Sequence, residues 1–366
     1  MQAKPPMTEP PFIQARSRFK QSRREKPLFS GGGPKRGVGI EGAFACLDNS
    51  TQGQMIFRHT KAIADGLGIP LNIIHVMEGT NTEHGPSDPI QWQIKYQEAK
   101  DYLRGILNEE HQDVVSHDHI LLNGIAGDEI SRWAKDHYGS LMVVASRSSL
   151  SDGGGHPREQ HDYLGDMAQK LLEGSAASLL LVPPGVPDTA PACYKRLLVP
   201  LDGSPRAESV LPLAIRIARK HDAELILVHM VPEPEIVETG PVDKEARDLM
   251  EQMLRYNEQK ARAYLDRLQA RLHSDSLAIR TLVESDGDPR ERLLTLSSRL
   301  DADLIVMSAH GRTGMVGMPC GNIARHIATH ARIPLLMVRQ HTGSRPDHQG
   351  MPEDGFGRRI FWESAH

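Results

Sequence analysis

The sequence predicts an α/β fold made of two tandem domains, each a doubly wound sheet of parallel strands with helices on both faces. Two observations predict it. The chain has 366 residues, which is enough for two domains that each bury a core. Short apolar runs rich in β-branched residues alternate with amphipathic helical stretches. Buried strands separated by helices are typical of parallel βαβ units, so the alternation favours a parallel sheet.

An internal repeat supports the division into two domains. Four segments of the first half recur in the second half in the same order. "FACLDNS" (44–50) matches "LVPLDGS" (198–204), and "LNIIHVME" (71–78) matches "LILVHMVP" (225–232). "GDEISRWAKDHYGSLMVVASR" matches "GDPRERLLTLSSRLDADLIVMSAH", and "LGDMAQKLLEGSAASLLLVPP" matches "CGNIARHIATHARIPLLMVRQ". We therefore expect two homologous domains.

The periodicity of the second domain predicts five strands and four helices. We expect strands near 195–201, 225–231, 278–284, 303–308 and 334–339, and helices near 205–220, 243–272, 289–299 and 321–330. The longest helix carries an apolar stripe that includes Leu249, Met253 and Tyr256, and we expect this stripe to pack in the core. Ligands of such sheets bind beyond the carboxyl ends of the strands, so the loops after the first and fourth strands are the candidate site.

The two ends of the chain differ in composition from the repeats. Residues 1–36 contain nine Lys/Arg, two Asp/Glu and six Pro, a net charge of +7. We expect a disordered basic arm, either simply solvated or binding RNA, an anionic surface or another protein. The first domain is expected at 37–185, a linker at 186–193 and the second domain at 194–340. A flexible tail is expected at 341–366, with "RRIFW" as a possible anchor for a partner.

Composition and motifs exclude several classes. The sequence contains no run of 18 apolar residues, so no membrane span is predicted. The N-terminal stretch lacks the apolar core of a secretory signal. Cys46, Cys193 and Cys320 show no paired spacing, which favours a reduced, cytoplasmic setting. His326 and His330 have the spacing of two metal ligands on a helix, but no third ligand accompanies them, so packing roles are favoured. No P-loop lysine or hydrolase elbow occurs, so no catalytic residue is assigned.

The loop after the fourth strand has the composition of an anion site. "SAHGRTGMVGMPCGN" (308–322) follows the apolar run "DLIVM" and precedes a predicted helix. Its four glycines let main-chain N–H groups approach a ligand, and the amino end of the helix adds partial positive charge. Arg312 and Asn322 supply further donors for phosphate oxygens, and Asp202 ends the neighbouring first strand. Taken alone, the loop is also compatible with a tight turn, and Asp202 with a helix cap.

These segments resemble the universal stress protein family, and the whole chain resembles a tandem universal stress protein. The resemblance rests on "RLLVPLDGSPRAESVLPLAIRIA", "AELILVHMV", "GDPRERLL", "ADLIVMSAHGRTG" and "CGNIARHIATHARIPLLMV". The family's nucleotide signature is glycine, two residues, glycine, nine residues, then glycine with Ser or Thr. Gly311 and Gly321 match the second and third glycines. Ser308 replaces the first glycine, and Asn322 replaces the hydroxyl residue.

The resemblance implies a Rossmann-like, five-stranded domain that occurs twice, with the last strands of the two domains meeting across a pseudo-two-fold axis as an internal dimer. Further association of two chains into a homo-oligomer is expected. The resemblance also implies ATP in the second domain, with ADP or AMP as alternatives and Mg²⁺ as a companion. It assigns Asp202 and Met230 to the base and ribose, Met307 and Ser308 to the pocket lining, and Gly311, Gly321, Asn322 and Ile323 to the phosphates, to which we add Arg312.

The first domain keeps the scaffold but not the loop. Asp48 stands where Asp202 does, and Ser148 takes the place of the second glycine. A longer segment separates Ser148 from Gly165, which Asp166 follows. A carboxylate at that position would repel a triphosphate, so we expect no standard ATP site in the first domain.

We therefore expect a cytoplasmic stress-response module in which ATP bound to the second domain biases conformation or assembly and so acts on a partner. Two alternatives stay open. The same pocket could serve a slow nucleotide hydrolase or transferase, or the chain could be a structural adaptor that binds no nucleotide, as some family members are.

Overall fold

The computed structural model describes residues 39–48, 52–78, 89–110, 119–137, 139–147, 163–185, 193–233, 244–273, 277–285, 287–312, 320–340 and 359–362. The predicted arm at 1–36 lies outside these residues, as does most of the predicted tail.

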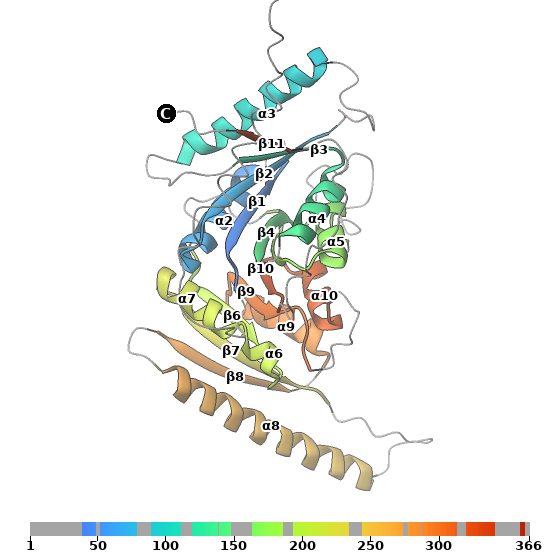
Figure 1. Ribbon diagram of the computed structural model, residues 1–366. Coiled ribbons are helices and arrows are strands. Elements are labelled where there is room, and N and C mark those ends of the chain that lie inside the picture. Colours follow the sequence, from blue (N-terminus) through green and yellow to red (C-terminus); the bar gives the residue numbers. More distant parts are fainter. Residues whose placement is uncertain are drawn as a thin grey trace, which may run out of the picture.

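Helices and strands alternate along the chain as predicted (Figure 1). The first domain contains β1 (Gly42–Leu47), α2 (Gly53–Leu67), β2 (Leu71–Met77), α3 (Pro89–Glu110), β3 (His119–Asn123), α4 (Ala126–Asp136), β4 (Ser140–Ala145), α5 (Asp166–Gly174) and β5 (Ser178–Val182). The second contains β6 (Arg196–Pro200), α6 (Pro205–Glu208), α7 (Leu211–His221), β7 (Glu224–Val231), α8 (Lys244–Leu272), β8 (Ile279–Ser285), α9 (Pro289–Arg299), β9 (Leu304–Ser308), α10 (Asn322–His330) and β10 (Leu335–Val338). A last strand, β11, spans Arg359–Trp362.

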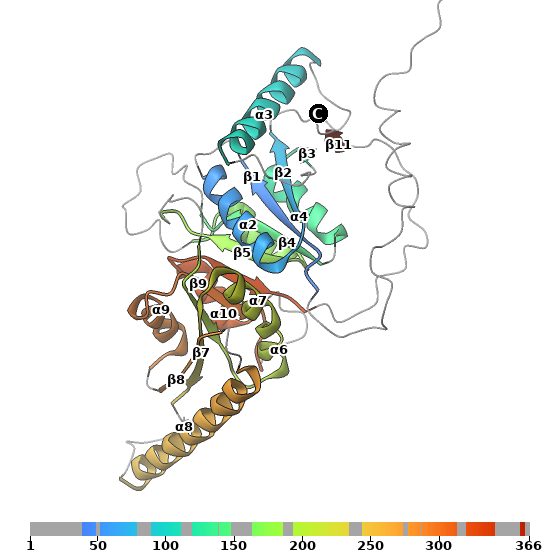
Figure 2. The same cartoon turned by 90° about the vertical axis from the view of Figure 1, so that its left-hand side faces the viewer.

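The described strands form one sheet that runs through both domains. Its order is β11-β3-β2-β1-β4-β5-β10-β9-β6-β7-β8. Within each domain all pairs are parallel, which confirms two doubly wound halves. The halves join where β5 and β10 pair antiparallel, with Leu180 opposite Leu336. The last strands of the two domains therefore meet as expected. Figures 1 and 2 show the first domain above and the second domain below.

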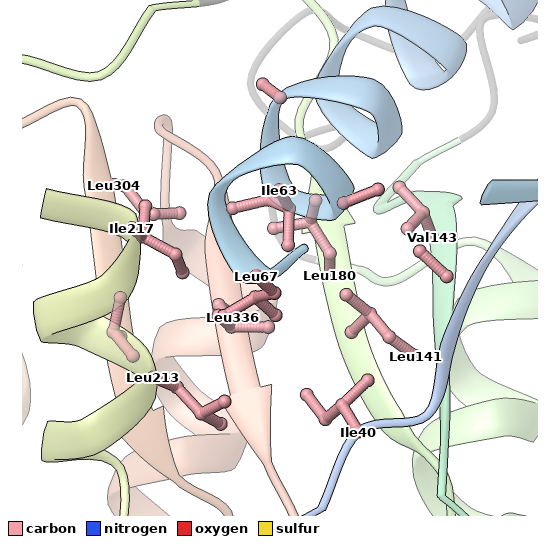
Figure 3. Packing of buried hydrophobic residues seen from close by; sticks show 14 of the residues in the cluster. Ile40, Ile63, Leu67, Leu141, Val143, Leu180, Leu213, Ile217, Leu304 and Leu336 are labelled. Atoms are coloured by element: carbon pink, nitrogen blue, oxygen red, sulfur yellow. The ribbon is translucent and has the colours of Figure 1, made fainter. Parts of the chain in front are cut away.

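Two helical layers cover the sheet. The apolar cluster on one face includes side chains of α2, α3, α7 and α8, and the cluster on the other face includes side chains of α4, α5, α9 and α10. Near the boundary, Ile63 of α2 and Ile217 of α7 lie over Leu180 and Leu336 of the central strands (Figure 3). A Cβ on Gly66 would lie 3.4 Å from the Cα of Ile217, so α2 and α7 approach closely. The hydrophobic core is thus continuous across the two domains.

Two buried arginines link the domains on the other face. Arg147 of the first domain donates through Nη1 to the Thr329 carbonyl at 2.9 Å and through Nη2 to the Ala331 carbonyl at 3.3 Å, at the end of α10. Arg339 of the second domain donates to the Leu172 carbonyl, near the end of α5. Carbonyls at a helix C-terminus lack intrahelical partners, and a cation there also meets the negative end of the helix dipole. Each domain therefore caps the last helix of the other.

The helix predicted over 205–220 is interrupted. α6 ends at Glu208 and α7 begins at Leu211. Pro212 in the first turn of α7 has no N–H to donate to the Glu208 carbonyl, and its ring crowds that carbonyl. The prediction of one continuous helix was wrong for this reason.

The core role predicted for the whole apolar stripe of α8 was also wrong. The buried residues of α8 are Ala261, Leu265 and Leu268, in its second half. Leu249, Met253 and Tyr256 are 52%, 44% and 58% exposed. A helix of 29 residues is about 44 Å long, whereas the eight residues of β7 span about 26 Å. The first half of α8 therefore extends past the sheet (Figure 2).

The outer edge of the first domain carries a strand that the sequence did not predict. β11 pairs antiparallel with β3, with Ile360 opposite Leu121. β11 lies within residues 341–366, for which a flexible tail was expected.

Candidate functional site

The loops after β6 and β9 meet at the carboxyl edge of the second domain, because these two strands are neighbours in the sheet. Asp202, which follows β6, connects them. Its Oδ1 accepts a hydrogen bond from the Ser204 N–H at 2.9 Å, and its Oδ2 accepts one from the Arg312 N–H at 2.5 Å. Burial raises the pKa of Asp202, but the hydrogen bonds from Ser204 and Arg312 and the Arg312 charge outweigh it and leave the pKa below its usual value. The carboxylate is therefore ionised at neutral pH.

Gly311 is a structural requirement of this junction. A Cβ at position 311 would collide with Oδ2 of Asp202. Gly203 has a φ of +76°, in the region that favours glycine, and the Arg312 guanidinium lies beside it. The absence of side chains at both positions lets the two loops close on each other around the carboxylate.

Gly321 has a different role. It precedes α10 with a φ of −72°, and a Cβ there would lie 3.6 Å from the Ala309 carbonyl oxygen, an ordinary contact. Backbone strain does not explain a glycine at this position, and neither does a lack of space among the described residues. No side chain of the described residues caps α10, so the N–H groups of its first turn, from Asn322 and Ile323, have no side-chain acceptor there.

The other predicted site residues lie at the ends of neighbouring strands. Met307 and Ser308 at the end of β9 are buried, with 7% and 8% exposed. Met307 and Met230 pack into the apolar cluster on the α9 and α10 face. The Ser308 Oγ lies 3.4 Å from the His310 N–H and accepts a hydrogen bond from it. Asp202, Gly311 and Arg312 are brought into direct contact, whereas no described contact joins them to Asn322 or Ile323.

A cavity of about 380 Å³ opens beside this junction, between the end of β7 and α8. This volume lies within the usual range for small-molecule sites. The cavity is lined by Gly203, His229, Val231, Pro232, Asn257, Lys260, Ala261, Tyr264 and Arg312. Of these, only Arg312 was among the predicted site residues. The α8 residues were missed because the apolar stripe of that helix indicated only core packing.

The charges around the cavity are unevenly distributed. Among the described residues Lys260 forms no ion pair, and its Nζ lies 5.1 Å from the centroid of the Tyr256 ring. The Arg312 guanidinium donates through Nη2 to the Asp202 carbonyl oxygen at 3.0 Å. Burial lowers the pKa of His229, which keeps its imidazole neutral at neutral pH. Two cationic side chains thus face the cavity, and the Asp202 carboxylate is already engaged by main-chain donors.

The α8 wall of the cavity consists of Asn257, Lys260, Ala261 and Tyr264. The Tyr264 hydroxyl donates to Oε1 of Glu208 at 3.1 Å, and Arg271 donates to Oε2 of the same carboxylate at 2.7 Å. The ring stands edge-on to His229, with the ring centroids 5.9 Å apart. The α6 carboxylate therefore fixes the position of this tyrosine relative to the cavity.

The other candidate clusters do not form comparable sites. His326 lies 3.0 Å from Oε1 of Glu291, and Nδ1 of His330 lies 2.9 Å from the His326 carbonyl oxygen. Within the described ranges, no group of three or more His, Cys, Asp and Glu could hold a metal ion. The same ranges contain no helix long and apolar enough to cross a membrane.

Comparison with known proteins decides the family. The model of the universal stress protein family matches residues 44–183 and again 193–339. The chain belongs to the universal stress protein family. The two halves of the sheet are thus two universal stress protein domains in tandem, as the repeat predicted.

Individual universal stress proteins are similar to one domain of this chain at a time. One from Methanocaldococcus jannaschii is 26% identical over 151 residues, which are 40% of this chain and 83% of that protein. One from Mycobacterium tuberculosis is 30% identical over 150 residues, 39% of this chain and 45% of that protein.

Among solved structures, a universal stress protein from Archaeoglobus fulgidus covers 82% of this chain and 99% of its own, with a TM-score of 0.53 and 17% identity. A functionally unknown protein from Pseudomonas aeruginosa covers 82% of this chain and 93% of its own, with a TM-score of 0.53 and 16% identity. At these identities the likeness supports the tandem fold alone.

Proposed function

We propose that the second domain binds an adenine nucleotide, with ATP as the leading candidate and ADP or AMP as alternatives, and that the chain acts as a stress-response binding module. The proposal rests on the signature at Gly311 and Gly321 and on the position of Asp202. The carrying observation is the cavity beside Asp202, Gly203 and Arg312, at the carboxyl edge where doubly wound sheets bind their ligands.

The lining of the cavity suits a nucleoside. Val231, Pro232 and Ala261 offer apolar surface for a base, and Tyr264 offers an aromatic ring. Asn257 carries both a donor and an acceptor, the combination that reads the edge of a base. A base in the cavity would leave the phosphates to run along Gly311 toward the first turn of α10, whose N–H groups have no side-chain acceptor among the described residues.

The charges suit the phosphates. Lys260 and Arg312 face the cavity from different elements, and cations attract phosphate oxygens more strongly in a partly desolvated site than in water.

The first domain differs from the second at α5, the helix equivalent to α10. Asp166 lies in the first turn of α5 and pairs with Lys170 at 3.0 Å. A carboxylate at this place opposes phosphate binding, which supports assigning the nucleotide to the second domain.

The mechanism we propose is a population shift. A bound nucleotide changes an equilibrium only by as much as its affinity differs between the two states. The described residues offer no arrangement of nucleophile and general base at the cavity, so we propose binding rather than rapid turnover. Association of two chains, and recruitment of a partner through 1–36 and 341–366, remain part of the proposal.

The test is to purify the full chain, denature it with acid and identify any released nucleotide by chromatography and mass spectrometry. The informative variant is Gly321→Asp, which places a carboxylate at the start of α10 and should abolish the released nucleotide. The matched control is Gly165→Asp, at the equivalent N-cap of α5, which should leave it unchanged. Asp is favourable at a helix N-cap, so neither variant should unfold the protein. A wild-type protein that neither releases nor binds nucleotide refutes the proposal.

A further inference from the structure

The two domains hold an equivalent tyrosine in two different positions. α3 and α8 follow the second strand of their domains, and their buried residues match at an offset of 162 residues: Ala99 with Ala261, Leu103 with Leu265 and Ile106 with Leu268. The same offset relates Tyr102 to Tyr264. Both rings also lie beside the equivalent histidine. The ring centroids are 5.7 Å apart for Tyr102 and His75, and 5.9 Å apart for Tyr264 and His229. The partner of the hydroxyl differs between the two domains.

In the first domain the tyrosine lies over the carboxyl end of β1. The Tyr102 hydroxyl donates to the main-chain oxygen of Asp48, the counterpart of Asp202. It also packs against Gly53 so closely that a Cβ at that position would collide with the hydroxyl oxygen. Tyr102 therefore occupies the place where a ligand would approach Asp48.

In the second domain the tyrosine is held away from that place. Its hydroxyl donates to Glu208, and the Asp202 carbonyl oxygen accepts from Arg312 instead. At an offset of 154 residues, Ala207 replaces Gly53 and Glu208 replaces Gln54. Since a Cβ on Gly53 would collide with the Tyr102 hydroxyl, the Cβ of Ala207 should likewise exclude the Tyr264 hydroxyl from the equivalent place. The Glu208 carboxylate is also a stronger acceptor than an amide.

We propose that Ala207 and Glu208 are positioning residues that keep Tyr264 clear of Asp202, and that they thereby decide which of the two domains presents an open nucleotide pocket. The inference rests on the proposed function. It adds a second difference between the domains to the Asp166 carboxylate: the position of the tyrosine, which leaves the pocket open in the second domain and fills it in the first. The two helices also differ in charge at one equivalent position: α3 has Glu98 where α8 has Lys260, at the same offset of 162 residues. The open position of the tyrosine and the cation on the same helix thus occur together.

The first arm of the test needs no ligand. A full-length chain carrying Ala207→Gly and Glu208→Gln has the Gly-Gln pair of the first domain. Its crystal structure should show the Tyr264 hydroxyl bonded to the Asp202 carbonyl oxygen. Glu251→Gln, which removes an exposed carboxylate from the outer half of α8, is the matched control and should leave Tyr264 on Glu208.

The second arm measures ATP binding by isothermal titration calorimetry. If the closed position is populated to nine tenths, the affinity of the double variant falls about tenfold, because apparent affinity scales with the binding-competent fraction. Adding Tyr264→Phe should restore most of the affinity, since phenylalanine has no hydroxyl to donate to Asp202. General damage to the pocket would not be repaired by a third substitution.

The outcomes separate the two hypotheses. If wild-type protein does not bind ATP, ADP or AMP, the proposed function fails, and the crystal structure still decides whether positions 207 and 208 hold Tyr264. If the wild type binds but the double variant keeps its affinity, the inference is overturned. It is equally overturned if Tyr264 stays on its α6 partner, or if Tyr264→Phe does not rescue binding.

Discussion

Leu180 of β5 lies directly opposite Leu336 of β10, and the two are also equivalent positions of the internal repeat, 156 residues apart. A pair of equivalent residues that face each other across an antiparallel pair lies on the local two-fold axis. Neither leucine is exposed at all, and the apolar cluster that contains both extends into each domain. On this face of the sheet the two domains are therefore joined through their apolar cores, and on the other face the hydrogen bonds of Arg147 and Arg339 add to the junction.

The boundary between β5 and β10 should contribute strongly to the free energy of unfolding. Leu180→Ala removes buried methyl groups from the boundary and should lower the free energy of unfolding by about 2–5 kcal/mol. Urea unfolding followed by circular dichroism measures the change. Leu249→Ala, at a leucine that is 52% exposed on α8, is the matched control and should change stability by about 0.5 kcal/mol or less. Equal effects of the two substitutions would contradict the central role of the β5–β10 pair.

The two glycines of the nucleotide signature should respond differently to alanine. Gly311→Ala puts a Cβ onto Oδ2 of Asp202, so the carboxylate has to leave the Arg312 N–H. We expect a loss of about 1–3 kcal/mol of stability by overpacking, together with weaker nucleotide binding. Gly321→Ala meets only an ordinary contact with Ala309 and should be nearly neutral for folding. Thermal unfolding and ATP titration of both variants check this, and equal stability of the two would show that position 311 has more room than the structure gives it.

Lys260 should contribute to ligand affinity through its charge. Lys260→Met keeps the length of the side chain but removes the ammonium group, and should weaken ATP binding about fivefold to tenfold at low salt. The difference from wild type should shrink as the salt concentration rises, because partly exposed charges are screened. Lys220→Met, on exposed α7 surface, is the control. A salt-independent loss would indicate that Lys260 acts by packing instead.

Acid should weaken the domain boundary through His59. Its Nδ1 lies 2.8 Å from the Tyr194 hydroxyl, and burial lowers the pKa of His59 to about 4. An unfolded histidine titrates near its ordinary value of about 6.5, so between these values the unfolded chain binds more protons and stability rises with pH. Stability should therefore fall as the pH drops from about 6.5 to about 4, by up to about 3 kcal/mol from this group.

The control for this prediction is His59→Gln, which is neutral at all these pH values. Urea unfolding at several pH values should give a flatter pH dependence for the variant over that window. An unchanged slope would mean that His59 titrates alike in the folded and unfolded states.

The apolar pattern of the sequence predicts the strands and helices best where burial alone determines them. The strands of the second domain lie within a residue or two of their predicted positions. For β6, β7, β9 and β10 the reason is that a buried strand has a nearly continuous apolar sequence. The edge strand β8 is only partly buried. The contact of Asp202 with Arg312 was also within reach, since both follow strands expected to end at the same edge. The helix break before Pro212 also has a local cause, because a proline inside a helical stretch removes a donor, but Pro205 and the apolar pattern by themselves favoured one helix.

The sequence could not assign the residues of the α8 wall to the site. Lys260 and Tyr264 share a helix whose period predicts only which residues face inward, not which strand they face. The repeat of the tyrosine at an offset of 162 residues was the one available signal, and it does not show that the two hydroxyls have different partners.

By itself, then, the sequence determined the repeat, the order of strands and helices, and the glycine and aspartate positions at the carboxyl edge, because periodic burial and turn chemistry are local properties. The tertiary structure alone decided that Tyr264 bonds Glu208, 56 residues away, and that a cavity opens beside Asp202. A polar side chain selects its partner by distance in space, and that distance is set only when the helices and the sheet have packed together.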